Sequence, residues 1–145
     1  MVPENVGFVP PVKSHESALA RLREMMPKAD EVKIQLTDKI RFEHCGGLFE
    51  GIKCPKCTKE IEVDRWQEWM DKDFGEDHDF KLEPIELSCC RASRTLHDLD
   101  YRPPQGFARF SLESLNPNIS EMPKKSLNTV EQILECPLRV IYRRI

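Results

Sequence analysis

The residues of this chain best suited to chemistry are its six cysteines, four of which come in two close pairs: Cys45, Cys54, Cys57, Cys89, Cys90 and Cys136. A chain of 145 residues buries roughly 68–70% of its unfolded surface, so it needs no disulfide framework. No secretory signal is recognisable at the N-terminus, which predicts a cytoplasmic location. In a reducing cytosol, clustered thiols are metal ligands more often than cystines. The cysteines therefore predict a metal-binding protein.

The two pairs predict one zinc site. The first is the tetrapeptide Cys54-Pro-Lys-Cys57, in which proline pre-sets a turn that aims two sulfur atoms at one point. The second, Cys89-Cys90, follows after 31 residues. Neighbouring cysteines reach one ion only from a tight turn, and such a turn is plausible just after Leu87. Four thiolates at about 2.3 Å from one ion describe a closed, tetrahedral site, so we predict one structural Zn²⁺ ion held by Cys54, Cys57, Cys89 and Cys90.

Other residues would complete the ligand set if only one cysteine of the second pair faces the ion. The alternatives are His97, Cys45 and His44, which lie near the pairs in sequence. Cys136 precedes Pro137 at the end of a helical stripe and is expected to be a small core residue.

The sequence contains no recognisable catalytic constellation. Glu86 and Asp98 are the carboxylates nearest to the second pair, and neither lies in an H-E-x-x-H or H-x-E…P-C-x-x-C motif. Closed sites with four cysteine ligands are predominantly structural. We therefore expect a protein that is not an enzyme and has no catalytic residues.

Three helices and several strands must position the cysteines. Apolar periodicity predicts helices that begin at Ser14, Asp64 and Asn128 and end near Met26, Phe74 and Pro137. Alternation predicts strands, with a hairpin turn at 37–39, over these ranges: 6–9, 31–36, 40–42, 48–53, 80–87, 107–112 and 138–142. This order favours a single α+β domain over residues 1–145, with a mostly antiparallel sheet and helices on one face in a ferredoxin-like split arrangement. Residues 54–90 would form an acidic insertion bounded by the zinc knuckles.

The cysteine motifs also support a resemblance. The second pair continues as Cys89-Cys-Arg-Ala-Ser-Arg-Thr-Leu-His-Asp-Leu-Asp-Tyr101, towards Pro103-Pro-Gln-Gly-Phe-Ala-Arg-Phe110. Together with the upstream Cys54-Pro-Lys-Cys57, the region from about 45 to 117 resembles small uncharacterised bacterial proteins with a zinc-ribbon-like pair of knuckles. The resemblance implies zinc at the four cysteines and no established activity. Ribbons usually place glycine after a knuckle cysteine, whereas this chain has Thr58 and Arg91 there.

Charge is distributed unevenly along the chain. The formal net charge is -3, but residues 60–86 carry eleven acidic and three basic side chains, a net charge of -8 that leaves +5 for the rest. An acidic surface accelerates association with a basic protein and repels phosphate backbones. The arginines are scattered without interleaved aromatic residues, which argues against nucleic-acid binding.

Taken together, these features predict a zinc-binding, non-enzymatic protein-interaction module, of the immunity or adaptor type, that recognises a basic partner. The alternative is a nucleic-acid-associated zinc-ribbon protein. No stretch approaches the ~20 apolar residues of a membrane helix, so no membrane association is expected. The sequence identifies neither the partner-binding residues nor the oligomeric state.

Overall fold

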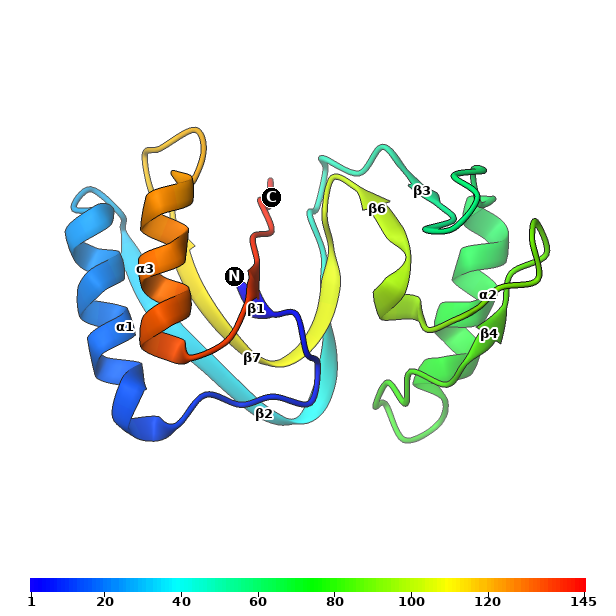
Figure 1. The fold of residues 1–145 in the computed structure, drawn as a ribbon, viewed down its shortest axis with the longest axis horizontal. Helices are drawn as coiled ribbons and strands as arrows, with labels where there is room; N and C mark the ends of the chain where they lie inside the picture. The colour runs from blue at the N-terminus through cyan, green and yellow to red at the C-terminus, as the bar shows by residue number, and fades with distance from the viewer. The chain divides into compact units, whose positions relative to one another are not determined.

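A computed structural model describes residues 1–145 as an α+β chain of three α-helices, one short 3₁₀ helix and several two-stranded sheets (Figure 1). The chain forms two compact units. The first unit comprises Met1–Asp38 and Ala108–Val140, and the second comprises Lys39–Phe107 and Ile141–Ile145. The single domain expected over residues 1–145 stays a prediction.

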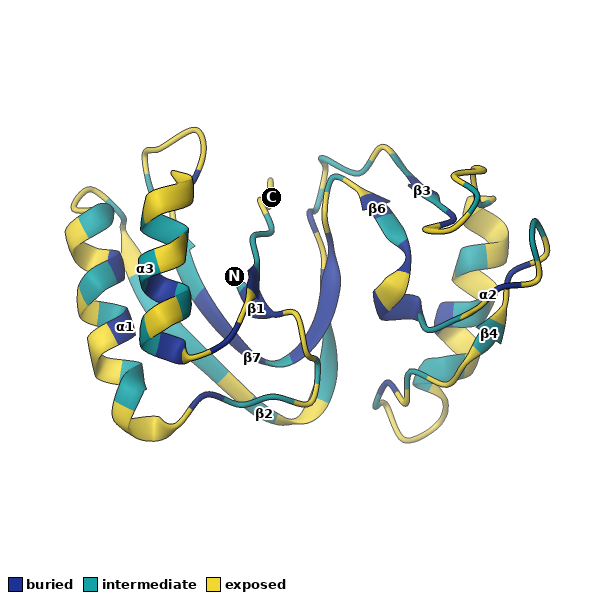
Figure 2. Cartoon of the chain, viewed as in Figure 1, coloured by how far each residue is buried: buried dark blue, intermediate teal, exposed yellow.

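The first unit is built on two helices and an aliphatic core. It contains α1 (Val12–Met25), α3 (Lys124–Leu134) and the antiparallel pair of β1 (Val2–Pro3) with β8 (Leu138–Arg139). Most of two long paired strands, β2 (Glu31–Glu43) and β7 (Gly106–Leu115), also belong to it. Figure 2 shows the buried residues of β7 and of the inner sides of both helices. The core cluster includes these side chains: Ala18, Leu22, Met26, Phe110, Leu112, Met122, Val130, Leu134, Cys136 and Leu138.

The helices begin at positions set by proline rather than by the expected side-chain caps. α1 starts directly after Pro11 and α3 directly after Pro123, and neither cap residue makes a side-chain hydrogen bond. The predicted cap residues Ser14 and Asn128 are therefore wrong: the observed caps, Pro11 and Pro123, lie three and five residues earlier. Proline fixes φ near the helical value at no cost in lost hydrogen bonds, because the first N–H groups of a helix have no partner within it.

The strands do not form the predicted ferredoxin-like sheet. They pair two by two, as β1 with β8, β2 with β7, β3 (Gly51–Lys53) with β6 (Asp100–Arg102), and β4 (Ile85–Glu86) with β5 (Ser93–Arg94). Alternation of apolar residues shows which segments are extended but not which segments pair. The α+β class is correct, and the single sheet is wrong.

β2 is one uninterrupted strand of 13 residues rather than a hairpin. The sequence Thr37-Asp-Lys39 is typical of a turn, yet here it stays extended. Arg109 on β7 donates from Nε to the carbonyl oxygen of Thr37 at 3.1 Å. This long-range bond joins residues 72 positions apart, and a local pattern cannot reveal it.

An aromatic core holds the second unit together. Phe42 lies at ring-centroid distances of 4.9 Å from Phe107, 6.0 Å from Trp66 and 6.0 Å from Tyr101. Trp66 comes from α2 (Val63–Phe74), and its indole N–H donates to the Tyr101 hydroxyl at 3.1 Å. That hydroxyl donates in turn to the carbonyl of Leu96, the first residue of the 3₁₀ helix Leu96–Asp98. Helix α2 is therefore fixed to the second unit by both aromatic packing and hydrogen bonds.

The predicted strand over residues 80–87 is reduced to β4. The Asp73 carboxylate accepts hydrogen bonds from the backbone N–H groups of Lys81, Leu82 and Glu83 at 2.8–2.9 Å. Because these donors are used by a helix side chain, they are not available to a sheet. Only Ile85 and Glu86 remain as a strand.

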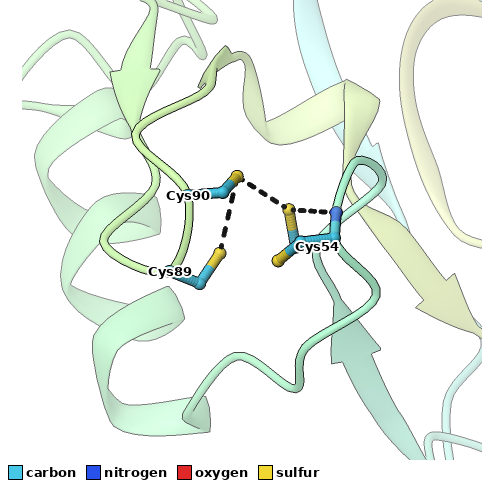
Figure 3. Close-up of side chains that lie close together, drawn as sticks. Cys54, Cys89 and Cys90 are labelled. Carbon is cyan, nitrogen blue, oxygen red and sulfur yellow. Dashed lines mark hydrogen bonds between the residues drawn. The ribbon is translucent and has the colours of Figure 1, made fainter.

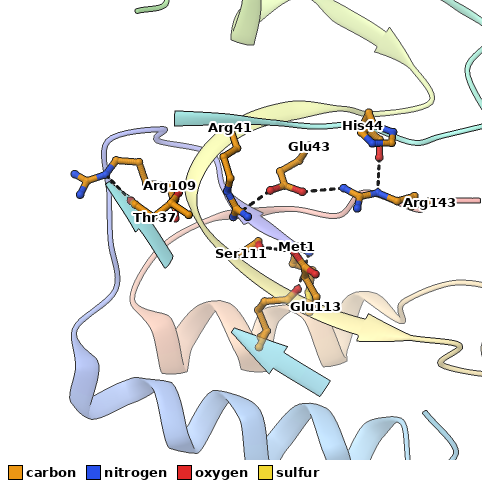
Figure 4. A network of polar contacts seen from close by, with 10 residues as sticks. Met1, Thr37, Arg41, Glu43, His44, Arg109, Ser111, Glu113 and Arg143 are labelled. Atoms are coloured by element: carbon orange, nitrogen blue, oxygen red, sulfur yellow. Dashed lines mark hydrogen bonds and ion pairs between the residues drawn. The ribbon is translucent and has the colours of Figure 1, made fainter. Parts of the chain in front are cut away.

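The C-terminal residues 141–145 are attached to the second unit. Arg143 donates to the Glu43 carboxylate at 2.9 Å and to the His44 carbonyl at 3.0 Å, and Arg41 lies 3.2 Å from the other oxygen of Glu43 (Figure 4). The Arg144 N–H donates to Cys45, and its carbonyl accepts from Gly47. Gly46 between them has φ of +63°, and a Cβ there would collide with the Arg144 carbonyl oxygen.

We predict that Gly46→Ala detaches residues 141–145 and destabilises the second unit. The left-handed backbone alone costs an L-residue about 1–2 kcal/mol, and relieving the collision requires Arg144 to move. Urea denaturation measures the free-energy loss, and hydrogen exchange at the Gly47 and Arg144 amides reports the detachment. Gly47→Ala is the matched control, because a Cβ there would meet Arg144 only at 3.8 Å. Equal losses in the two variants would contradict this account.

Candidate metal centre

The first cysteine pair forms a tight knuckle at the end of β3. The Cys54 N–H donates to the Lys59 carbonyl at 2.8 Å, and the Thr58 N–H donates back to the Cys54 carbonyl at 3.0 Å. Inside this turn the N–H groups of Lys56 and Cys57 both point at the Cys54 sulfur, at 3.4 Å each. The backbone therefore offers two donors to one thiolate.

The second cysteine pair lies in a turn of the same construction, between β4 and β5. The Leu87 N–H donates to the Ala92 carbonyl at 2.9 Å, and the Arg91 N–H donates to the Leu87 carbonyl at 2.7 Å. Cys89 and Cys90 occupy the turn itself. The sequence predicted that adjacent cysteines would need such a turn, and the structure contains it.

The two knuckles bring four sulfur atoms together. The Sγ atoms of Cys54, Cys57, Cys89 and Cys90 all lie within 4.8 Å of one another. The Cys90 Sγ lies 3.7 Å from that of Cys54 and 3.9 Å from that of Cys89, and Figure 3 marks both contacts with dashed lines. A disulfide would need about 2.0 Å, and all four cysteines are free.

These separations fit a tetrahedral zinc ion. Four sulfur atoms at about 2.3 Å from a central ion are roughly 3.8 Å from one another. The cluster already has nearly that spacing, so small side-chain movements suffice to bind the ion. Zinc held in this way would cross-link the two knuckles. Four thiolates would fill the four positions of a tetrahedral ion.

Two cysteines of the cluster have pKa values shifted in opposite directions. Burial opposes ionisation of Cys54, but the N–H groups of Cys57 and Lys56 and the neighbouring thiols outweigh it and lower the Cys54 pKa to about 6. Hydrogen bonding to Cys57, together with burial and the charge on Cys54, raises the pKa of Cys89 to about 12. The Cys54 thiolate therefore forms more readily than the Cys89 thiolate.

The alternative ligands lie elsewhere and have other roles. His97 is buried, and its Nδ1 accepts the Phe107 N–H at 3.1 Å. The His44 Nδ1 accepts from Gly46 at 3.1 Å. Cys45 is fully buried, and that burial raises the pKa of its thiol. The structure groups the four knuckle cysteines without these three residues.

The remaining candidates also have structural positions. Cys136 belongs to the core of the first unit, which confirms the prediction of a small core residue. Asp98 accepts hydrogen bonds from the Thr95 N–H and hydroxyl and caps the 3₁₀ helix. Glu86 is an exposed residue of β4.

Each knuckle turn forms without glycine, because the residue after its last cysteine adopts a left-handed backbone. Thr58 has φ of +65° and Arg91 has φ of +57°, in the left-handed region where ribbons usually have glycine. The chain therefore keeps the knuckle geometry and bears its conformational cost. The sequence does not reveal these left-handed conformations, because threonine and arginine rarely adopt them.

We predict that Thr58→Gly and Arg91→Gly each stabilise the second unit. Removing Cβ relieves about 1–2 kcal/mol of left-handed strain, of which roughly half is offset by the greater freedom of glycine in the unfolded chain. Thermal melts of the zinc-loaded protein should show a higher midpoint for both variants. Lys56→Gly, at an exposed turn position whose φ is not positive, should lower the midpoint. A lower midpoint for all three variants would show that the strain is absent.

Comparison with models of known protein families, with curated proteins and with solved structures finds no match. No helix of the structure has the length and apolar character needed to cross a membrane. The four-cysteine cluster is consistent with a pair of zinc knuckles. The resemblance to zinc-ribbon-like proteins is limited to this cluster and identifies no family.

Proposed function

We propose that this protein is a zinc-binding, non-enzymatic protein-interaction module in which Cys54, Cys57, Cys89 and Cys90 hold one structural zinc ion. The observation that carries the proposal is the convergence of the four Sγ atoms, all within 4.8 Å. The zinc acts as a clamp: it closes the loop between the knuckles, and that loop contains helix α2. Loop-closure entropy grows slowly with length, so one ion is sufficient to hold a segment of this size.

We expect the purified protein to contain one zinc ion per chain by native mass spectrometry. Cys54→Ser should lose the ion, because it removes the buried ligand that two N–H groups support. Chelation should destabilise the second unit by several kcal/mol, since a site of four thiolates is rarely preformed without its ion. Cys45→Ser and Cys136→Ser serve as controls and should retain the metal. Loss of zinc in Cys45→Ser, or its absence from the wild-type protein, would refute the assignment.

The clamped segment presents the acidic surface. Of the acids in residues 60–86, Asp73 and Asp79 are half-buried and hold the local backbone, Asp73 through the three bonds described above and Asp79 through the Ile40 N–H at 3.0 Å. Glu68 and Asp77 form ion pairs with Arg65 and Lys81. The other acids are exposed and form no ion pair: Glu60, Glu62, Asp64, Asp71, Glu76, Glu83 and Glu86. We define these seven residues as the acidic face.

The acidic face supports the proposal of a basic protein partner. Unpaired exposed carboxylates repel one another and contribute little to folding, whereas a complementary surface of positive charge is attracted to them from a distance. Two of these charges, Asp64 and Asp71, lie on helix α2, and a zinc clamp would limit the movement of the segment that carries all seven. A rigid arrangement lowers the entropy cost of binding.

We predict that Glu62→Gln combined with Glu76→Gln slows association with an oligolysine peptide. Electrostatic steering accelerates association 10- to 1,000-fold when many charges act together, so loss of two charges should slow it about two- to fivefold. Stopped-flow fluorescence at low ionic strength measures the rate, and the difference should vanish at high salt. Glu16→Gln with Glu121→Gln, two exposed acids of the first unit, is the matched control. Equal effects of the two pairs would exclude the acidic face as the binding surface.

A second candidate, a nucleic-acid-associated protein, is favoured by the charges on the knuckles themselves. Lys56, Lys59 and Arg91 are exposed in the two turns and form no ion pair. Phosphate backbones attract such cations in a salt-dependent manner. A single-stranded oligonucleotide in place of oligolysine distinguishes the two functions, since salt-dependent binding that is lost on Lys56→Gln and Lys59→Gln would favour nucleic acid.

A further inference from the structure

The two knuckles follow the same backbone path, which allows their residues to be matched one by one. In each turn the first residue donates its N–H to a carbonyl five positions later and accepts at its own carbonyl an N–H from four positions later. In each, that N–H belongs to a residue with a left-handed backbone, Thr58 or Arg91. The path therefore equates Cys54 with Leu87 and Cys57 with Cys90.

This matching shows that Cys89 does not occupy a usual ligand position. It corresponds to Lys56, the third residue of the first knuckle and an exposed one. The position of the first ligand in the second knuckle is held instead by Leu87, which is 1% exposed. Cys54, Cys57 and Cys90 are thus three regular knuckle ligands, and Cys89 is a fourth thiol supplied from a different point on the turn.

The hydrogen bonds to the sulfur atoms also differ between Cys89 and the regular ligand Cys54. Two backbone N–H groups donate to the Cys54 sulfur. The hydrogen-bond partners of the Cys89 sulfur are thiols only. N–H donors stabilise a thiolate and hold it at the metal. The Cys90 sulfur also has thiol partners. These bonds therefore make Cys54 the best-supported ligand, and it is the position in the turn that sets Cys89 apart from Cys90.

We propose that Cys89 is the exchangeable ligand of this site: Cys54, Cys57 and Cys90 retain the zinc ion while the Cys89 sulfur leaves it and reacts with electrophiles. The inference rests on the proposed zinc-binding function. When Cys89 leaves, its electron pair returns to sulfur. With an alkylating agent such as iodoacetamide, that pair forms a carbon–sulfur bond and iodide departs, so no oxidant or reductant is needed. Cys89 is therefore also the site at which the metal centre is open to modification from solution.

Limited alkylation of the zinc-loaded protein tests this inference. Exposure alone does not favour Cys89, because Cys57, Cys89 and Cys90 are all half-buried. Peptide mapping after a limiting dose of iodoacetamide should find Cys89 modified first. Native mass spectrometry should find zinc still bound in the singly modified chain. Modification of Cys57 or Cys90 first, or release of zinc in step with the first modification, would overturn the inference while leaving the zinc site intact.

A pair of neighbouring substitutions provides a second readout. Cys89→Ser should keep one zinc ion per chain, with an affinity about 10- to 100-fold lower, the loss typical of removing a supporting group rather than a principal ligand. Cys90→Ser, at the adjacent regular position, should lose the ion. Equal loss in both variants would overturn the inference. Failure of the wild-type protein to bind zinc would overturn the proposed function itself and the inference with it.

Discussion

Four cysteine sulfur atoms lie within 4.8 Å of one another, and this convergence imposes an electrostatic requirement on the rest of the second unit. Thiolates at such distances repel one another strongly. The pKa of Cys54 is lowered to about 6, and the pKa of Cys89 is raised to about 12. The divalent cation proposed for this site would replace the thiol protons and turn the repulsion into a cross-link.

Apart from its aromatic core, the second unit has little regular structure to hold its knuckles. Its sheets are the short pairs β3–β6 and β4–β5, of two or three residues a strand. The aromatic core fixes one face of α2 through Trp66, but the knuckle turns have an exposed outer surface and two residues in strained conformations. The first unit, in contrast, has two helices packed over an aliphatic cluster. The proposed zinc ion would therefore affect the stability of the second unit more than that of the first.

Sequence reasoning succeeded where residue type and short spacing determine the outcome. The cysteines were identifiable because only a few side chains bind zinc, and a C-x-x-C turn presents two of them at once. The three helices were predicted because their apolar periods are local. The continuity of β2 was not predicted, since it depends on a hydrogen bond from Arg109 to Thr37 across 72 positions. The loss of the strand over 80–84 depends in the same way on the carboxylate of Asp73.

The order in which the two units lie along the chain affects how the protein is made. The first unit is interrupted by Lys39–Phe107 and resumes only at Ala108. A ribosome therefore releases both knuckles and α2 before it synthesises α3, whose Val130 and Leu134 complete the aliphatic core. Domains fold as their residues emerge, so a nascent chain has all four thiols available for zinc while its first unit is still incomplete. Under the proposed function, cellular zinc supply during translation would act on this protein before most of its aliphatic core exists.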